Sequence, residues 1–399
     1  MRTQTGFFTS LSRRGLTRRR CTTLSGDAEQ QATQVAWVQT TFGGVCRAKK
    51  GGLALHLGLK SAVTSKKVNF MFLKKLTSLR FTLLTIITTV MLLNAPSVLA
   101  ESKPSIKVTL LGTGNPEPSI QRFGPSVLVE AGSEKMVFDA GAGTAKRLWQ
   151  LGIPLGNAGP FFLTHLHSDH TVDIPDIWLN GYVATPYGGR KTPLEIYGPE
   201  GTKNMMMYLR KAFYWDIHGR ERGPGKPVVA FTATEIKEGV VFNRNGVVVT
   251  AFLVDHGHPD LTPAFGYRVD YAGKSVVISG DTRFNKNLIK FAKDTDVIVH
   301  EVIAANPKLL AQSEAVRGIV GLHTPPDDAG RVFNAVKPKF AVYTHIVLLG
   351  NSSFPAPSVD ELVPLTRETY MGPVVVGEDL MRINIGDTVS IEKLTLPAH

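Results

Sequence analysis

Cysteine is almost absent from this chain. Its 399 residues include only two, Cys21 and Cys46, and both lie in the first hundred residues. Residues 101–399 therefore contain no disulfide and no thiolate ligand. Histidine and carboxylate side chains must hold any metal ion that binds there.

An excess of charge of one sign is also missing from the greater part of the chain. The formal net charge is +12, which alone would indicate a nucleic-acid partner. However, residues 1–100 hold 15 of the 45 Lys and Arg residues and 2 of the 33 acidic ones. Residues 101–399 are thus close to neutral, which excludes a basic field over the whole body. They are long enough for one large domain or two small ones.

The apolar run Phe81–Leu93 is too short for a membrane span, which needs about 20 apolar residues. It follows Met71 and a basic stretch, and the small side chains of Val98 and Ala100 come after it. This order predicts a signal peptide over 71–100 that is cut after Ala100. The mature protein is then expected in the periplasm or outside the cell, without a stable membrane anchor.

Residues 1–70 show no convincing apolar periodicity. We interpret them as an upstream extension without a folded role, with translation starting at Met71. Their arginines, interspersed with Ser and Thr, also fit an organellar transit peptide, and this alternative stays open.

Residues 101–399 are predicted to form two comparable successions of strands and helices. The expected strands are 106–111, 126–130, 135–139, 161–164, 194–197, 247–254, 264–269, 275–279, 297–299 and 340–344. The expected helices are 145–151, 173–182, 202–217 and 327–336. Such a pattern indicates two sheets packed face to face with helices outside.

The densest group of polar side chains follows the expected strand 161–164. It reads His165-Leu-His167-Ser-Asp169-His170. Clustering so many polar groups costs free energy unless a cation satisfies them, and zinc accepts both imidazole and carboxylate ligands. At a strand end His165 and His167 share a face and can bind one metal ion, and the following turn suits Asp169 and His170 to a second. The alternative interpretation is a polar loop that caps the start of a helix, but a cap would not need three histidines.

Three further polar residues, His256, Asp281 and His345, end other apolar strands. Each alone would be an ordinary loop residue. A carboxylate at such a position can bridge two cations about 3.5–4 Å apart. Together with the first cluster these residues complete seven ligands and predict a dinuclear centre.

At these positions the sequence resembles the metallo-β-lactamase superfamily, in its ribonuclease Z and arylsulfatase-like branch. The resemblance spans almost all of residues 105–390, and its segments are Thr109–Asn115, Phe138–Gly143, His165–His170, Asp255–Gly257, Pro263–Arg268, Gly280–Thr282, His300–Glu301, His323–Thr324 and Thr344–His345. It implies a four-layer αβ/βα sandwich in the α/β class, with metals at one edge between the two sheets.

The resemblance also implies the assignment of the ligands. His165, His167 and His256 would hold one metal ion. Asp169, His170 and His345 would hold the other, and Asp281 would bridge the two. His258 is the rival of His256, which is preferred because family members commonly carry Asp-His-Gly before Pro-x-Phe-Gly-Tyr.

Two zinc ions per chain are the expected cofactors, with manganese or iron as alternatives. A water molecule between two zinc ions has its pKa lowered from about 15.7 towards 7, which makes hydroxide available for attack. Asp169 can orient that water. The family counterpart of His323 donates a proton to the leaving oxygen; the alternative is that His323 is a surface histidine.

Asp139 and Glu301 are expected either to orient the metal ligands or His323, or to cap turns.

The substrate is inferred from what this chain lacks. Short bacterial ribonucleases Z carry a long tRNA-gripping arm between their Phe-Gly-Tyr-Arg and Gly-Asp-Thr segments, whereas here only Val269–Ser279 separates them. Aromatics beside Arg in Tyr208–Pro227 could instead form the wall of a pocket for an aromatic anion; a helix packed on the surface is the alternative.

These features favour an exported hydrolase of small sulfate or phosphate esters, resembling the arylsulfatase-like members. Ribonuclease Z-type tRNA 3′ processing is the alternative, and lactone or thioester hydrolysis is third. A metal-free binding protein is disfavoured because no ligand position is lost. The expected partner is a small anionic ester rather than nucleic acid, because phosphate contacts dominate nucleic-acid affinity; a homodimer is an additional expectation.

Overall fold

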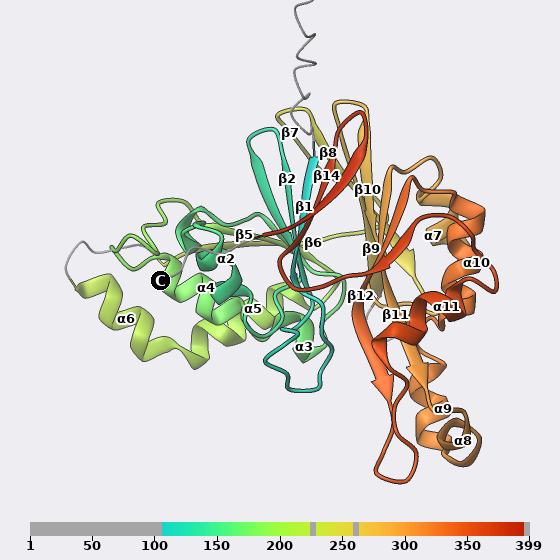
Figure 1. Cartoon of the computed structure of the whole chain (residues 1–399). Coiled ribbons are helices and arrows are strands. Elements are labelled where there is room, and N and C mark those ends of the chain that lie inside the picture. Colours follow the sequence, from blue (N-terminus) through green and yellow to red (C-terminus); the bar gives the residue numbers. More distant parts are fainter. Residues whose placement is uncertain (1–105, 224–228, 258–262, 395–399) are drawn as a thin grey trace, which may run out of the picture. The chain divides into compact units, whose positions relative to one another are not determined.

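Two mixed β-sheets face each other, with helices on their outer sides, in the computed structural model (Figure 1). The structure describes residues 106–223, 229–257 and 263–394. The predicted extension, the signal peptide and His258 lie outside these residues. The predicted sandwich of two sheets with helices outside is confirmed.

In the described residues the first sheet has eight strands and the second has seven. In spatial order the first sheet contains β15 (Val389–Lys393), β14 (Met381–Ile385), β1 (Ile106–Gly112), β2 (Ser126–Ala131), β3 (Glu134–Phe138), β4 (Phe161–Phe162), β5 (Leu194–Gly198) and β6 (Phe231–Glu235). The second contains β13 (Val374–Val376), β12 (Phe340–Leu349), β11 (Val297–Ala305), β10 (Lys274–Ile278), β9 (Ala264–Tyr271), β8 (Val247–Val254) and β7 (Gly239–Arg244).

The strands are apolar on both faces because each sheet is covered on both sides. In β2, Val129 faces the core between the sheets, whereas its neighbour Leu128 faces the helices. Phe162 of β4 lies in the inner core, where its ring stacks on Phe138 and Tyr197 at centroid distances of 5.0 Å each. Complete burial of such a side chain stabilises the fold by about 1.5–3 kcal/mol.

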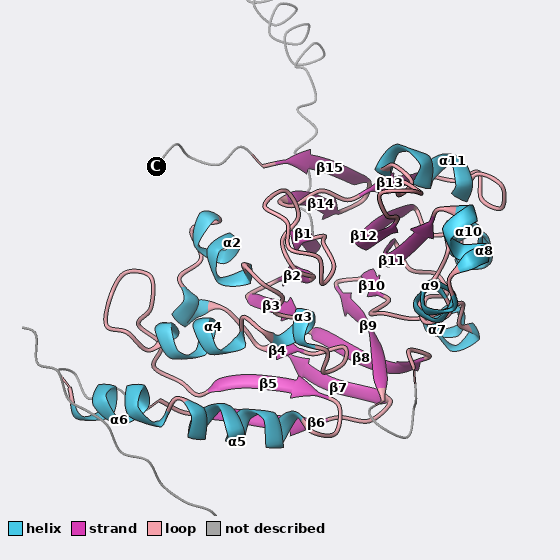
Figure 2. Cartoon of the chain, turned by 90° about the horizontal axis from the view of Figure 1, so that it is seen from below, coloured by secondary structure: helices cyan, strands magenta, loops and turns pink. Residues whose placement is uncertain are grey.

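Helices of unequal length cover the two outer faces (Figure 2). On the first sheet the apolar faces of α2 (Thr144–Gln150), α4 (Ile174–Gly181), α5 (Thr202–Ala212) and α6 (Tyr214–Arg222) form an outer core, which also includes the 3-10 turn Leu155–Asn157. On the second sheet a corresponding core includes α7 (Lys286–Phe291), α10 (Pro326–Val336) and α11 (Leu362–Thr366), which follows the 3-10 turn Val359–Glu361. The remaining helices are α3 (Ser168–Thr171), α8 (Pro307–Gln312) and α9 (Glu314–Val320).

Most predicted elements are present, with different ends. The predicted helix 202–217 is two helices, α5 and α6, and the predicted strand 340–344 continues to Leu349. Several elements were not predicted: α3, α7, α8, α9, α11, β6, β7, β13, β14 and β15. None of the described helices is long and apolar enough to span a membrane.

Candidate metal centre

Three imidazole rings converge where β4 and β8 end. Nε2 of His165 lies 2.8 Å from Nδ1 of His167, and this Nδ1 lies 3.3 Å from Nε2 of His256. His165 and His167 follow β4 of the first sheet, and His256 follows β8 of the second. The three rings form a group that could hold a metal ion, so the two sheets meet at one set of ligand atoms.

A second group lies beside the first. Oδ2 of Asp169 is 3.4 Å from Nε2 of His170 and 3.4 Å from Nε2 of His345. Asp169 and His170 lie on α3, and His345 lies on β12. These three residues also form a group that could hold a metal ion.

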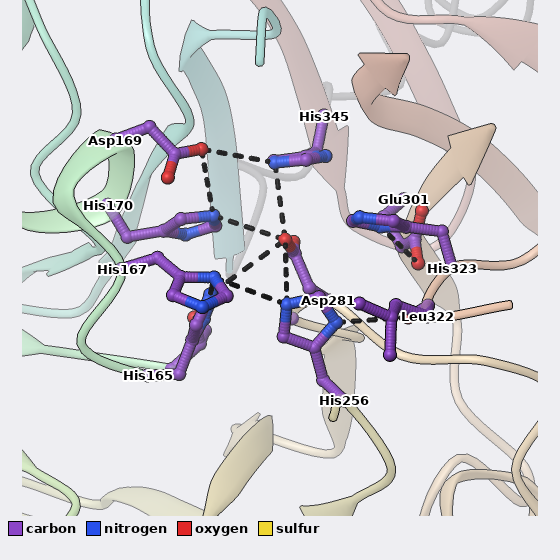
Figure 3. A network of polar contacts seen from close by, with 12 residues as sticks. His165, His167, Asp169, His170, His256, Asp281, Glu301, Leu322, His323 and His345 are labelled. Carbon is purple, nitrogen blue, oxygen red and sulfur yellow. Dashed lines mark hydrogen bonds and ion pairs between the residues drawn. The ribbon is translucent and has the colours of Figure 1, made fainter. Parts of the chain in front are cut away.

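Asp281 lies between the two groups (Figure 3). Its Oδ2 is 3.3 Å from Nε2 of His170 and 3.2 Å from Nε2 of His345. The same atom is 3.9 Å from Nε2 of His165 and 3.8 Å from Nε2 of His256. A carboxylate in this position can bridge two cations. The structure thus brings together all seven residues that the sequence singled out.

The spacing of these atoms fits metal coordination. Atoms that bind zinc tetrahedrally at about 2.0–2.1 Å lie about 3.3 Å from one another. The separations of Asp281 from His170 and His345 match this value. In addition, Nε2 of His170 is buried and lacks a hydrogen-bond partner among the described residues. A divalent cation would satisfy this nitrogen.

Unusual backbone conformations direct two of the ligands. His345 lies at a β-bulge, because Glu301 pairs with Thr344 and Val302 pairs with Ile346. Its φ of 42° is rare for a residue with a side chain. Before Asp281, Gly280 has a φ of 61°, and a Cβ there would lie 2.5 Å from the carbonyl oxygen of Phe265. Only glycine fits this close turn.

Hydrogen bonds orient the ligand rings. Nδ1 of His170 donates to Oδ2 of Asp139 at 2.8 Å, and the backbone N–H of Thr164 donates to Oδ1 of the same carboxylate. Nδ1 of His256 donates to the carbonyl oxygen of Leu322 at 2.9 Å. Because carbonyl and carboxylate oxygens accept these protons, both rings present Nε2 to the centre. Asp139 makes the orienting contact that was one of its two predicted roles.

Glu301 makes both kinds of contact that were predicted for it, one with His323 and others with backbone N–H groups of neighbouring turns. Its Oε1 accepts hydrogen bonds from Nδ1 of His323 at 3.2 Å and from the backbone N–H groups of Thr282 and Thr324 at 3.1 Å each. The ring of His323 stacks on that of His345 at 5.5 Å. His323 also belongs to two further groups of three that could hold a metal ion. The geometry therefore allows it to act as a proton donor or as a ligand.

The centre combines buried charges of both signs. Burial is the main reason that the pKa of His165 lies well below its ordinary value. Burial also opposes the charge of His170, but Asp281 and Asp139 outweigh it and raise the pKa of His170 well above its ordinary value. Burial favours a neutral Asp281, yet His345 and His170 outweigh it and hold its pKa well below the ordinary range. A bound divalent cation can replace the proton on His170 as the counter-charge.

A cavity of about 420 Å³ opens beside the centre, with His167, Asp169, His256, Asp281, His323 and His345 in its wall together with Asn115–Glu117, Ile319, Leu322 and Val347–Leu349. A second cavity of about 390 Å³ also contacts Asn115–Glu117 and Asp169. No described residue of α6 lines either cavity. The predicted pocket wall in Tyr208–Pro227 is therefore wrong for the described part of that segment, because α6 packs on the outside of the first sheet.

Sequence reasoning missed the residues that complete the cavity wall beside the predicted ligands and His323. Asn115 was noted only as the end of the family-like segment Thr109–Asn115, yet its Nδ2 donates to the carbonyl oxygen of Ile346 at 2.6 Å and fixes the loop beside His345. Leu322 contributes a carbonyl oxygen, which no side-chain pattern reveals. At Asn115 the available signals were the family-like segment Thr109–Asn115 and the Gly- and Pro-rich composition of the loop.

Known proteins resemble this chain in sequence and in structure. Residues 136–346 match the Beta-lactamase superfamily domain. Ribonuclease Z of Mycolicibacterium gilvum is 31% identical over 285 residues, which cover 70% of this chain and 96% of the relative. Human tRNase Z, short form, shares the fold with a TM-score of 0.52 at 22% identity, over 70% of this chain and 99% of the human one. The metallo-beta-lactamase fold protein YhfI from Bacillus subtilis reaches a TM-score of 0.54 at 17% identity, over 69% and 98%.

These comparisons overturn the expected hydrolysis of small sulfate or phosphate esters. Relatives at about 30% identity are named ribonuclease Z and match nearly over their whole length. The expectation that nucleic acid is an improbable partner falls with it. It rested on a neutral body and on the short Val269–Ser279 segment, which is a hairpin turning at Ala272 and Gly273. Neither feature excludes RNA binding. The net charge is a sum over residues 101–399, and a short loop at one position leaves other surfaces of the protein available.

Proposed function

Because this chain belongs to the metallo-β-lactamase superfamily, in the branch that includes the ribonucleases Z, and is a metal-dependent hydrolase, we propose that it is a ribonuclease Z-type endoribonuclease. Its substrate would be a precursor tRNA, cut at a phosphodiester bond near the 3′ end. The observation that carries this proposal is the 31% identity to a ribonuclease Z over 96% of that relative's length.

Two zinc ions are the proposed cofactors, with manganese or iron as alternatives. The seven ligands would be His165, His167 and His256 on one side, Asp169, His170 and His345 on the other, and Asp281 between them. Imidazole nitrogen and carboxylate oxygen are ligands that zinc accepts, and the described residues contain no thiolate that would select a softer metal. When bound, such a pair supplies positive charge opposite the phosphate and water of lowered pKa.

Side chains of the protein would carry out the proton transfers. Asp169 lies on the wall shared by both cavities, where its carboxylate can orient the attacking water and accept its proton. His323 lines the first cavity, and Glu301 accepts from its Nδ1, so Nε2 is the nitrogen that can donate a proton. As the water oxygen bonds to phosphorus, the P–O3′ bond breaks and O3′ takes that proton. The products are an RNA ending in a 3′-hydroxyl and a trailer with a 5′-phosphate.

The proposal is tested with the purified full chain and a precursor tRNA that carries a 3′ trailer and a 5′ label. Chelated and zinc-restored protein are compared, and the position of the cut is mapped to the nucleotide. We expect one dominant cut at the 3′ side of the acceptor stem, lost in chelator and regained with zinc. The variant Asp281→Ala is the control for contaminating nucleases and should give no cut.

An aryl sulfate, an aryl phosphodiester and a lactone are assayed in parallel. If the chain hydrolyses one of these rapidly in a chelator-sensitive way and leaves the precursor tRNA intact, the proposal is wrong. A cut that persists in chelator, or in the Asp281→Ala protein, would also count against it.

A further inference from the structure

The helix pair α5–α6 exposes aromatic side chains to an unusual degree. Of the fifteen large hydrophobic residues exposed in the described part of the chain, five lie between residues 207 and 215: Met207, Tyr208, Phe213, Tyr214 and Trp215. Trp215 is 82% exposed and Tyr208 is 65% exposed. In α6 only Ile217 is buried. A helix that buries one residue presents nearly all of its surface outward, and such exposed apolar clusters mark interaction sites.

This surface is basic, in contrast to the rest of the body. Residues 202–222 contain five Lys and Arg residues and two acidic ones, whereas residues 101–399 as a whole contain 30 and 31. Acidic partners reach some of these cations: Arg210 lies 3.4 Å from Glu221, and Arg220 lies 2.7 Å from Asp216. Lys211 and Arg222 form no salt bridge with any described residue. Lys211 lies over the ring of Tyr208, 5.2 Å from its centroid.

The aromatic and basic groups are interleaved. Tyr214 stacks on His218 at 5.1 Å and contacts Trp215 edge-on at 5.3 Å. Aromatic faces that alternate with cations match the chemistry of single-stranded nucleic acid, whose bases stack while its phosphates bind Lys and Arg. Figures 1 and 2 show α6 at the outer end of the helical layer on the first sheet, apart from α3, which carries Asp169 and His170.

We propose that the α5–α6 surface, formed by Lys203 to Arg222, is a second contact for the RNA substrate. This inference rests on the proposed function and adds to it the way in which a long substrate is gripped. An RNA long enough to reach both places would contact α5–α6 while its scissile bond lies at the metal centre. A small phosphodiester would contact the centre alone.

A second copy of this chain is the competing occupant, and charge disfavours it. A two-fold dimer contact brings a surface against itself. The excess cations of one α5–α6 surface would then face those of the other. A polyanion neutralises the same groups.

The test compares an RNA with a small diester. The variant Tyr214→Ala/Trp215→Ala removes two stacking faces, and Lys211→Glu/Arg222→Glu reverses the two cations without salt bridges. Matched controls are Met371→Ala, at a residue that is 81% exposed outside this surface, and Lys293→Glu/Lys337→Glu, with the same change in charge. For each protein, kcat and KM are measured with precursor tRNA and with bis(p-nitrophenyl) phosphate.

Each α5–α6 variant should raise KM for the precursor tRNA about tenfold and leave hydrolysis of the small diester unchanged. One stacked base contributes about 1–3 kcal/mol, and about 1.4 kcal/mol corresponds to a factor of ten. The charge-reversal variant should also lower the salt dependence of RNA binding. The control variants should behave as the wild type in both assays.

Binding of the same RNA to the chelated protein, followed by fluorescence anisotropy, separates this inference from the proposed function. Weaker RNA binding by the α5–α6 variants supports the inference, whether or not the wild type cuts RNA. A wild type that binds RNA without cutting it contradicts the proposed function but not this inference. Equal RNA affinity for all variants overturns the inference. A dimer in light scattering that Tyr214→Ala/Trp215→Ala dissociates without loss of RNA affinity also overturns it, and assigns the surface to a second copy.

Discussion

Nδ1 of His323 lies 3.2 Å from Oε1 of Glu301, and this carboxylate is almost completely buried. The pair fixes the ring so that Nε2 is left for the cavity. Two roles follow from this geometry, because the same ring could donate a proton or bind a metal ion. The predictions for His323 are chosen to separate these roles.

Replacing His323 with alanine should slow cleavage of precursor tRNA by about 10²–10³-fold, within the range that general acid catalysis supplies. The leaving O3′ of RNA needs a proton, whereas p-nitrophenolate leaves without one. Cleavage of bis(p-nitrophenyl) phosphate should therefore fall less than about tenfold. Metal content, measured by mass spectrometry, should stay at the wild-type value. Equal slowing of both substrates with loss of metal would assign His323 to the ligands.

The pH dependence of RNA cleavage tests the same pair. Burial lowers the pKa of His323, but the Glu301 carboxylate outweighs it and raises the value to about 9. A proton donor works in its protonated form, so the rate should fall as pH rises through this pKa. Cations bound beside His323 repel its charge and place this limb at or below about 9. In Glu301→Gln the limb should move to lower pH, as measured by kcat/KM profiles; an unmoved limb would contradict the role of Glu301.

The two groups of ligands should respond differently to substitution. Asp281 contacts both groups, so Asp281→Ala should lose both metal ions and all detectable turnover. His167 contacts only the first group, so His167→Ala should retain about one metal ion per chain and also lack turnover. Metal analysis of purified proteins checks this difference. His218→Ala, at a histidine of α6 that belongs to neither group, is the control and should keep the wild-type content.

A further prediction concerns the N-terminal region, which lies outside the described residues. Cleavage of the predicted signal peptide gives a mature chain that starts at Glu101, and N-terminal sequencing of the protein from its natural source would detect it. A start before Met71 would contradict export. It would also keep the chain in a compartment that contains precursor tRNA, in agreement with the proposed function.

The sandwich fold was predictable from the sequence, and the candidate ligands stood out more clearly than the ends of the strands and helices that carry them. Metal ligands need particular side chains at strand ends, and such residues stand out: His165, His256 and Asp281 each follow an apolar run. His345 does lie near the other candidate ligands, but it was wrongly expected to follow its strand. It lies inside β12 at a bulge, and a bulge leaves no pattern in the sequence because it depends on the register with β11.

The edge strands of the sheets and part of the cavity wall were missed for a physical reason. In β6 and β7 most side chains are partly exposed, so neither strand shows a long apolar run. The carbonyl oxygen of Leu322 reaches His256 through the folding of the backbone, and any residue type would supply it. Contacts of this kind are specified by tertiary structure and not by residue identity.

The substrate was misjudged because an average hid a local feature. The near-zero net charge of residues 101–399 conceals the basic stretch of α5–α6, where Lys211 lies over the exposed ring of Tyr208. Binding of a polyanion depends on local charge density within a Debye length of about 10 Å at 0.1 M salt, and not on the sum over the chain.

Asp139 provides a last prediction, because it acts on the metal only through His170. It occupies the left-handed region at φ 59° and accepts from His170 and from Thr164. Asparagine tolerates this backbone conformation, so Asp139→Asn should fold normally while losing the negative charge that favours the orientation of His170. We expect metal affinity to fall about 10–100-fold, measured by chelator competition, with full activity restored at high zinc. Asp139→Ala should show a larger loss, because alanine removes all the hydrogen bonds that the carboxylate accepts from His170 and Thr164. An unchanged affinity in the asparagine variant would show that the charge of Asp139 has no part in holding the metal.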